Sequence, residues 1–306
     1  MTIFATSIAV IIAVYALWRK NYVLLLLLCA ILAWWYFCGT NKYELFEGRM
    51  HRSQLSREDE KKLVELLTPV DVEGMKFERL GADADGGYVV PVNGQYDYHI
   101  CLGVGGDVTF ENDILGRVLN EVICFDHTVP SLPAHADDRL RWVKRGVSDK
   151  ETATLTTLPR IIKNLKHYGN MSLKMDIEGW EFPVMNSLSE QDLQNFDLIV
   201  TEFHCLGNKG DGGGGDSGPI KNPKMKLKAL QKLSKTHFLV HIHSTPHVLP
   251  LRLSDGTLVP YVPELTFVRK KGRQAKKTRR SFPTDLDQTL QNKAHIKNRK
   301  HSLRFI

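Results

Sequence analysis

Three side chains that could perform acid–base or metal chemistry follow two apolar stretches of the chain. In SLKMDIEGWEF, apolar and polar residues alternate as in a strand, and Asp176 ends that strand. DLIVTEFH is a second strand, which ends in Glu202 and His204. Because the carboxyl ends of parallel strands meet at one edge of a sheet, these side chains could bind a divalent metal or remove a proton from a hydroxyl nucleophile. The structural alternative is an ion pair between Lys174 and Asp176.

Further acids and histidines are expected around this edge. We expect Glu178 to line the same pocket, or else to form a structural ion pair. Glu181 falls in the first turn of the next predicted helix, where an acid complements the helix dipole, so it needs no catalytic role. His241 and His243 share one face of a later strand. They could add metal ligands, but we favour histidines that are satisfied within the core.

A glycine-rich turn predicts where a cofactor binds. In LGVGGDVTFEND, Gly103 and Gly105 follow a buried strand and let the backbone turn sharply and approach a ligand closely. Asp107 and Glu111 enter the helix that follows. Two acids at this helix end disfavour a phosphate and favour a cationic group such as an ammonium. The structural alternative is a tight strand–helix turn.

Two later strand ends could complete the cofactor site. Asp126 in ICFDHT lies about twenty residues after the glycines, where an acid accepts the ribose hydroxyls of an adenosine cofactor. Ser148 and Asp149 end a third strand and could meet an adenine amino group. Capping of a helix by Asp149 explains these two residues equally well.

The turn GADADGGYVVP allows three interpretations. Gly86 and Gly87 permit unusual backbone angles beside Asp83 and Asp85. The segment could lie over the cofactor, or it could form the DxD manganese site of a glycosyltransferase. It could also be an ordinary Asp-Gly turn before a short strand.

Seven apolar stretches alternate with helical patterns and must position these residues. This alternation predicts an α/β fold with a parallel sheet covered by helices on both faces. Residues 207–223 contain four consecutive glycines, so we expect a surface loop there. The predicted strands are 98–104, 121–126, 140–149, 172–179, 197–204, 237–244 and 264–270, and the predicted helices are 110–120, 158–168, 183–188 and 224–234.

The first 38 residues are the most apolar part of the 306-residue chain. The run at 22–38 has no charge and ends in an aromatic cluster, as expected at a membrane interface. As a helix it would be roughly 25 Å long, enough to cross a slightly thinned bilayer. With the weaker run at 3–17 it predicts a membrane anchor of one or two helices. If Arg19 and Lys20 stay cytoplasmic, the later residues lie in a lumen, and we favour that side although basic residues after the anchor oppose it.

Basic residues are concentrated near the end of a chain whose formal net charge is +7. The stretch RKKGRQAKKTRR contains no acid and no aromatic residue. Such a run is typical of a solvated tail and could touch anionic lipids, so it gives no ground to expect a nucleic-acid partner. None of the five cysteines forms a CxxC pair, which argues against a zinc site or a disulfide framework.

Taken in order, DGGYVVP, LGVGGDVTFEND, FDHTV, LKMDIEGWEF, IVTEFH, VHIH and PELTFVRK resemble the FkbM-type methyltransferases, a branch of the class I S-adenosylmethionine-dependent fold. The resemblance implies a Rossmann-like, seven-stranded sheet whose last strand is antiparallel. It implies S-adenosylmethionine at Gly103, Gly105 and Asp126, and methyl transfer to an oxygen, commonly a sugar hydroxyl. The chain departs from the family in the spacing G-V-G-G-D, where the fuller pattern is G-x-G-x-G.

We therefore predict a membrane-anchored, S-adenosylmethionine-dependent O-methyltransferase that acts on a carbohydrate or glycoconjugate. Two alternatives stay open: a lumenal glycosyltransferase with a DxD manganese site, and a membrane-tethered binding module without turnover. The predicted parts are a membrane anchor at 1–38, a helical juxtamembrane linker at 39–73, a methyltransferase-like domain at 74–270 and a basic tail at 271–306.

Overall fold

The computed structural model describes residues 50–165, 169–207, 221–245 and 248–287. The predicted membrane anchor at 1–38 lies outside these ranges, as do most of the glycine-rich loop and the end of the basic tail. Within the described ranges, every helix is too short or too polar to span a bilayer. The described elements from His51 onward belong to one compact unit.

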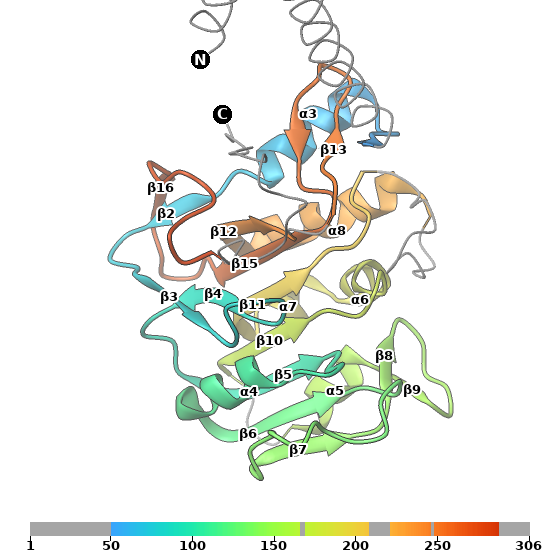
Figure 1. Cartoon of the computed structure of the whole chain (residues 1–306), viewed down its shortest axis with the longest axis vertical. Coiled ribbons are helices and arrows are strands. Elements are labelled where there is room, and N and C mark those ends of the chain that lie inside the picture. The colour runs from blue at the N-terminus through green and yellow to red at the C-terminus, as the bar shows by residue number, and fades with distance from the viewer. Residues whose placement is uncertain (1–49, 166–168, 208–220, 246–247, 288–306) are drawn as a thin grey trace, which may run out of the picture. The chain divides into compact units, whose positions relative to one another are not determined.

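A seven-stranded sheet forms the centre of this unit (Figure 1). Its strand order is β12-β15-β11-β10-β5-β6-β7. Neighbouring strands are parallel except at β15, which is antiparallel to both β11 and β12. The prediction of seven strands with an antiparallel last strand is thus confirmed. The strands are β5 Tyr96–Leu102, β6 Val118–Phe125, β7 Leu140–Val143, β10 Met171–Met175, β11 Phe196–Glu202, β12 His237–Ser244 and β15 Pro263–Arg269.

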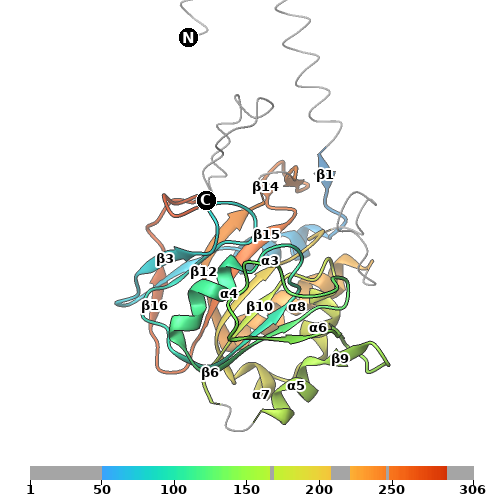
Figure 2. The same ribbon diagram turned by 60° about the horizontal axis from the view of Figure 1, so that its bottom comes forward.

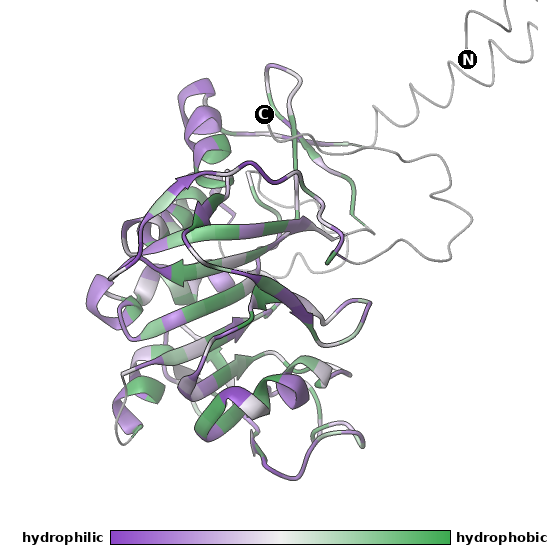
Figure 3. Cartoon of the chain, turned by 90° about the vertical axis from the view of Figure 1, so that its left-hand side faces the viewer, coloured by the Kyte–Doolittle hydropathy of each residue, from purple (hydrophilic) through white to green (hydrophobic). Residues whose placement is uncertain are grey.

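The central strands are apolar on both faces because both faces are covered. Leu173 in β10 pairs with Ile100 in β5 and with Ile199 in β11, and all three side chains are fully buried. The strands of the sheet are accordingly largely hydrophobic in Figure 3. The same register aligns the ends of the strands, since Met175 pairs with both Leu102 and Thr201. The residues that follow these three strands therefore emerge at one edge.

Different layers cover the two faces of the sheet. One face packs against α3 Arg57–Leu66, α5 Leu158–Asn164, α6 Glu181–Ser187 and α8 Pro223–Thr236. The other packs against α4 Thr109–Ile114 and the hairpin of β3 Phe77–Leu80 and β4 Tyr88–Pro91. Figure 2 shows α4 on the opposite side of the sheet from α6 and α8. Helices were expected on both faces, but a β-hairpin supplies much of the second layer.

Two predicted elements are shorter in the structure. The strand expected at 140–149 is divided into β7 and β8 Gly146–Ser148, and β8 pairs in parallel with β9 Leu155–Thr157 outside the main sheet. The division follows from Arg145, whose guanidinium donates to the backbone oxygens of Thr152 and Leu155 and holds the bend. The helix expected at 110–120 ends early, in the 3-10 turn η1 Leu115–Arg117, because β6 begins at Val118.

The segment before the sheet is part of the folded unit. Ser56 caps α3, since its hydroxyl accepts a hydrogen bond from the amide of Asp59 at 3.2 Å. Leu63 of α3 and the adjacent Leu67 are buried in the main core. The remaining short elements are β1 His51–Arg52, β2 Val70–Val72, α7 Glu190–Leu193, β13 Leu251–Arg252, β14 Leu258–Val259 and β16 Ala275–Lys277.

Residues 271–287, expected within the basic tail, also pack on this unit. Strand β16 pairs with β2. The guanidinium of Arg280 binds Asp71 at 2.8 Å and lies between the rings of Phe77 and Phe282. Arg273 also binds Asp197 at 2.7 Å, so two basic residues of this segment are used in structural contacts, whereas Lys271, Lys276, Lys277 and Arg279 are exposed.

Phe282 should anchor this segment, because its side chain is only 6% exposed. We expect Phe282→Ala to lower the free energy of unfolding by about 3 kcal/mol, as for other buried aromatic truncations. Leu286→Ala is the control, since Leu286 is 36% exposed, and it should cost less than about 1 kcal/mol. Urea unfolding of both variants checks this. Equal losses would contradict the packing of Phe282.

Candidate active site and cofactor cavity

A cavity of 460 Å³ lies where β5, β6 and β10 end. It is lined by the glycine turn after β5, by the residues after β6, by the β8–β9 unit and by the turn after β10. This volume lies within the range of small-molecule sites, which is roughly 300–1,000 Å³. Among the predicted site residues, those that line the cavity are Gly103, Gly105, Asp126, Asp176 and Glu178.

The glycine turn has the geometry that its sequence requires. Gly103 and Gly105 have φ angles of +86° and +57°, in the left-handed region that favours glycine. A Cβ atom on Gly103 would lie 1.8 Å from the backbone oxygen of Asp176, so the two loops meet backbone to backbone. A Cβ atom on Gly105 would meet only open space. Gly103 is therefore needed for packing as well as for its φ angle.

Asp126 closes the glycine turn from the end of β6. One carboxylate oxygen accepts the amides of Val104 and Gly105 at 3.0 and 3.1 Å, and the other accepts the amide and hydroxyl of Thr128 at 2.7 and 2.6 Å. Burial opposes ionisation, but these hydrogen bonds hold the pKa of Asp126 below its usual value. Because four donors fill its acceptor positions, a ribose hydroxyl could bind here only by replacing one of them, most simply the Thr128 hydroxyl.

Asp107 and Glu111 lie outside the cavity lining. Asp107 accepts hydrogen bonds from the amide and hydroxyl of Thr109, so it caps the start of α4. Glu111 is buried near Lys174, whose ammonium donates to the backbone oxygen of Gly103 at 2.6 Å. Burial disfavours the Lys174 charge, but the surrounding acidic groups raise the pKa of Lys174 overall. Lys174, with Glu111 nearby, thus stabilises the glycine turn through the hydrogen bond to the Gly103 backbone oxygen.

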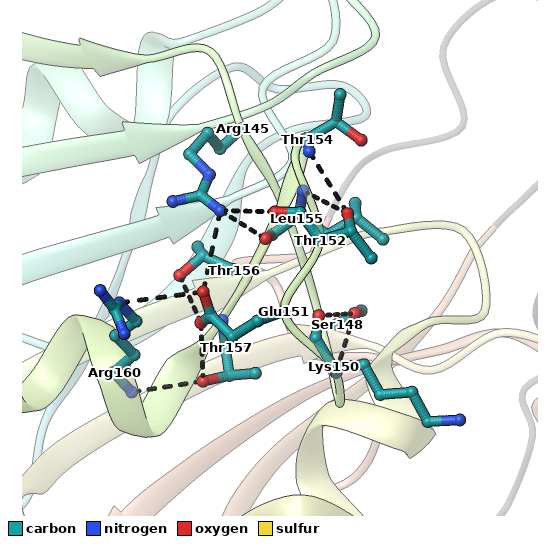
Figure 4. A network of polar contacts seen from close by, with 10 residues as sticks. All are labelled: Arg145, Ser148, Lys150, Glu151, Thr152, Thr154, Leu155, Thr156, Thr157 and Arg160. Carbon is teal, nitrogen blue, oxygen red and sulfur yellow. Dashed lines mark hydrogen bonds and ion pairs between the residues drawn. The ribbon is translucent and has the colours of Figure 1, made fainter.

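The β8–β9 unit forms another wall of the cavity (Figure 4). Gly146, Val147 and Leu155 line the cavity, whereas Ser148 and Asp149 do not. The Ser148 hydroxyl instead makes a local turn with the backbone of Lys150, as Figure 4 shows. This wall offers mainly apolar surface, which suits the face of an aromatic ring.

The predicted acid–base residues come together after β10 and β11. His204 is the centre of the group: its Nε2 lies 4.0 Å from Asp176 Oδ1 and 3.5 Å from Glu178 Oε2, and its Nδ1 lies 3.1 Å from Glu181 Oε1. Glu202 accepts a hydrogen bond from the Thr245 hydroxyl at 2.6 Å. Asp176, Glu181 and His204 form the set whose possible metal ligands lie within 4.8 Å of one another, so Glu181 takes the place expected for Glu202.

Burial and charge fix the protonation of this group. Burial disfavours the His204 cation, but Glu181, Glu202 and Asp176 outweigh it and raise the pKa of His204 to about 10. Burial and the charge of Asp176 raise the pKa of Glu202 to about 8. Burial also raises the pKa of Glu178. The neighbouring acids thus favour a His204 cation, and burial favours the protonated form of Glu202.

Glu181 is the residue whose part in this group the sequence did not show. It is the first residue of α6, as expected, but its side chain is fully buried. Its Oε1 accepts the amides of Ile177 and Gly179 as well as the His204 ring. Glu181 therefore fixes both the turn after β10 and the orientation of His204. An acid beside a glycine turn was the available signal, but its partner His204 is 23 positions away.

Two non-glycine residues in these loops have left-handed backbones. Glu178 has φ +56° and Cys205 has φ +57°. Such conformations cost of order 1–3 kcal/mol and are concentrated at functional sites. They lie directly beside the acid–histidine group, because Glu178 follows Asp176 by two positions and Cys205 follows His204 by one. The strain is thus located where the candidate chemistry is.

The loop at 81–87 packs against the start of α4. The Ala82 amide donates to the Thr109 hydroxyl, and a Cβ atom on Gly86 would lie 2.6 Å from Asp107. A Cβ atom on Gly87 would clash with the Ala82 backbone oxygen at 2.1 Å. In the described part of the chain, the metal-ligand set includes neither Asp83 nor Asp85. The tight backbone contacts explain both glycines without a ligand.

His241 and His243 contact the C-terminal segment. His241 Nε2 binds Asp287 at 2.7 Å, and His243 Nδ1 lies 3.6 Å from the same carboxylate. Neither histidine belongs to the metal-ligand set of the described residues. The two histidines thus lie against residues 284–287, but His241 Nδ1 and His243 Nε2 are buried without a hydrogen-bond partner among the described residues, so the pair is only partly satisfied.

Comparison with known proteins gives one family match. Residues 83–216 match the family model described as the Methyltransferase FkbM domain. No curated protein matches the chain. A solved structure described as "Putative hemolysin from Streptococcus thermophilus" has 12% sequence identity and a TM-score of 0.29, and the alignment covers 58% of this chain and 61% of that one. The chain thus spans less than two thirds of that protein, and a likeness of this size supports no functional comparison.

The two glycines of the cavity should differ in their tolerance of a side chain. Gly103→Ala combines backbone strain with a clash, so it should lower the free energy of unfolding by about 3 kcal/mol or more. Gly105→Ala adds only the left-handed backbone cost of about 1–2 kcal/mol. Guanidinium unfolding of the two variants measures the difference. Equal losses would show that Gly103 does not pack against the Asp176 backbone.

Proposed function

We propose that this chain, whose residues 83–216 match the FkbM methyltransferase domain, is an S-adenosylmethionine-dependent methyltransferase that methylates a hydroxyl of a carbohydrate or glycoconjugate. The main support for this proposal is that the cofactor cavity and the acid–histidine group lie next to each other. The cavity at the glycine turn is lined at one end by Asp176 and Glu178, which lie beside His204. The family match favours a methyltransferase over the glycosyltransferase alternative, whereas a module that keeps the methyltransferase fold without turnover is tested by the transfer assay below.

The cavity fits the cofactor that the family implies. The turn at Gly103 and Gly105 offers close backbone approach, and Val147 and Leu155 supply an apolar wall for an adenine ring. Asp126 would accept the ribose hydroxyls once the Thr128 hydroxyl is displaced. When bound, S-adenosylmethionine supplies an electrophilic methyl group on a sulfonium sulfur.

Asp176 is the best-placed proton acceptor of the site. It lines the cavity, whereas neither His204 nor Glu202 belongs to the lining. Asp176 would accept the hydroxyl proton of the acceptor, while the bound cofactor would supply the methyl group and leave as the neutral thioether. His204 acts as a positioning residue that stabilises the carboxylate, and Glu181 holds His204 in place.

The charge of the site supports a hydroxyl-bearing acceptor. Asp176 and Glu178 line the cavity and supply acceptors for sugar hydroxyls. The same acids would repel a phosphate or carboxylate acceptor. A neutral polyol therefore fits better than an anionic acceptor.

We also propose that residues 1–38 anchor the protein in a membrane, with the methyltransferase domain on the lumenal side. The support is the charge-free run at 22–38 and the Arg19-Lys20 pair before it. The full chain should remain in the membrane pellet after alkaline carbonate extraction. Release into the supernatant would refute the anchor.

The cofactor site can be tested by binding alone. Asp126→Asn should weaken S-adenosylmethionine binding at least about tenfold, because the turn loses charged acceptors. Thr128→Val opens an acceptor position on Asp126 and should retain or improve the affinity. Isothermal titration calorimetry measures both variants. A strong loss in Thr128→Val alone would contradict the ribose assignment.

The transfer itself can be tested with radiolabelled S-adenosylmethionine and a panel of glycans. Asp176→Asn should reduce transfer at least about a hundredfold while it spares cofactor affinity, as expected for loss of a general base. The exposed Asp255→Asn, in the β13–β14 turn, is the matched control and should keep full transfer. If the wild type fails to bind S-adenosylmethionine, the proposed function is wrong. If Asp176→Asn stays active, the base is another residue.

A further inference from the structure

Asp176, Glu181 and His204 come from three elements that the sheet brings to one place. Asp176 follows β10, Glu181 begins α6 and His204 follows β11. One ligand atom of each lies within 4.8 Å of the others. Oxygen and nitrogen ligands bind a divalent ion at about 2.0–2.2 Å, so neighbouring ligands stand roughly 3–4 Å apart. His204 presents Nδ1 to Glu181 and Nε2 to Asp176, so its ring would have to turn for one nitrogen to share an ion with both carboxylates.

One atom of the set is buried without a partner. Glu181 Oε2 makes no hydrogen bond within the described residues, although the side chain is fully buried. Its other oxygen is held by two backbone amides and by the His204 ring, so the carboxylate is fixed in position. A buried acceptor without a partner costs about 1–3 kcal/mol. A bound cation would satisfy it.

The charge around the set also favours a cation. Asp176, Glu178 and Glu181 all lie within 4.0 Å of the single His204 ring. Within this group Glu181 is fully buried, whereas the Asp176 side chain is 24% exposed and that of Glu178 is 62% exposed. The mixture of carboxylates and one imidazole in this group is suited to manganese and similar divalent ions.

We propose that Asp176, Glu181 and His204 bind one divalent cation, and that Glu178 closes the site from the cavity side. The ion replaces the His204 proton, because a ligating imidazole is neutral. The ion would polarise the acceptor hydroxyl, and the released proton would pass to the carboxylate oxygen of Asp176 that does not bind the ion. This role rests on the proposed function, but the binding of the ion does not.

Manganese binding by the full chain tests the site without turnover. Titration with Mn²⁺ is followed by the electron paramagnetic resonance signal of the free ion, which is lost on binding. The wild type should bind one equivalent. Asp176→Asn, Glu181→Gln and His204→Gln should each weaken binding about 10–100-fold. Glu264→Gln removes another buried carboxyl group at the same edge, outside the set, and should stay within about twofold of the wild type.

The variants at Glu181 and His204 change buried groups, so thermal unfolding must show that they are folded. Asp176→Asn keeps the test decisive in either case, since the Asp176 side chain is 24% exposed and the change preserves its shape. The proposal is overturned if the wild type leaves the free Mn²⁺ signal unchanged at millimolar concentration, or if Asp176→Asn binds as tightly as the wild type.

S-adenosylmethionine calorimetry on the same preparation separates the two proposals. Cofactor binding without Mn²⁺ binding overturns the metal site and leaves the proposed function intact. Mn²⁺ binding without cofactor binding overturns the proposed function and supports the metal site.

Discussion

The buried ammonium of Lys174 joins the two loops on which the cavity depends. It extends from β10, donates to the Gly103 backbone oxygen and lies among the acids Glu111 and Asp176. A cation in this position offsets two carboxylates that would otherwise be costly to bury. It also holds the glycine turn against the turn after β10, where the backbones of Gly103 and Asp176 meet. The cofactor side and the acid–base side of the site are thus built on one shared contact.

The parallel strands place this contact at the edge of the sheet where the other site residues also lie. Because β5, β10 and β11 end in register, the glycine turn, Asp176 and His204 follow each other across the sheet. Glu181 adds two contacts through one atom. Its Oε1 accepts the amide of Ile177 in the turn after β10, and it also orients the His204 ring. Glu178 and Cys205 have left-handed backbones, which non-glycine residues disfavour, so the contacts around these two loops must hold them in this conformation.

The sequence predicted what depends on local pattern. Alternating apolar residues gave the seven strands, and the glycine spacing gave the sharp turn after β5. Asp176 and His204 could be placed together because parallel strand ends share an edge. Glu181 was assigned only to the helix dipole, since nothing near it in sequence shows that α6 begins beneath His204. The role of Glu181 depends on its contact with His204, which lies in a different loop.

Other differences have the same origin. The division of the strand at 140–149 depends on Arg145, whose partners lie seven and ten positions further along the chain. The basic tail was expected to be solvated because its charges have no local partners. Arg280 instead meets Asp71, which lies 209 positions earlier. A short stretch of sequence does not show which distant residue a side chain will contact, whereas the folded structure does.

The attachment of the C-terminal segment has a consequence for the order of folding during synthesis. Arg280 contacts Asp71 and Asp287 contacts His241, so the last described residues join elements made much earlier. On the ribosome, β2 and the end of β12 must wait for these partners until nearly the whole chain has emerged. The sheet can form its central strands during translation, but this edge is completed only afterwards. During synthesis, β2 and the end of β12 are therefore the parts of the fold that stay exposed for the longest time before the C-terminal segment covers them.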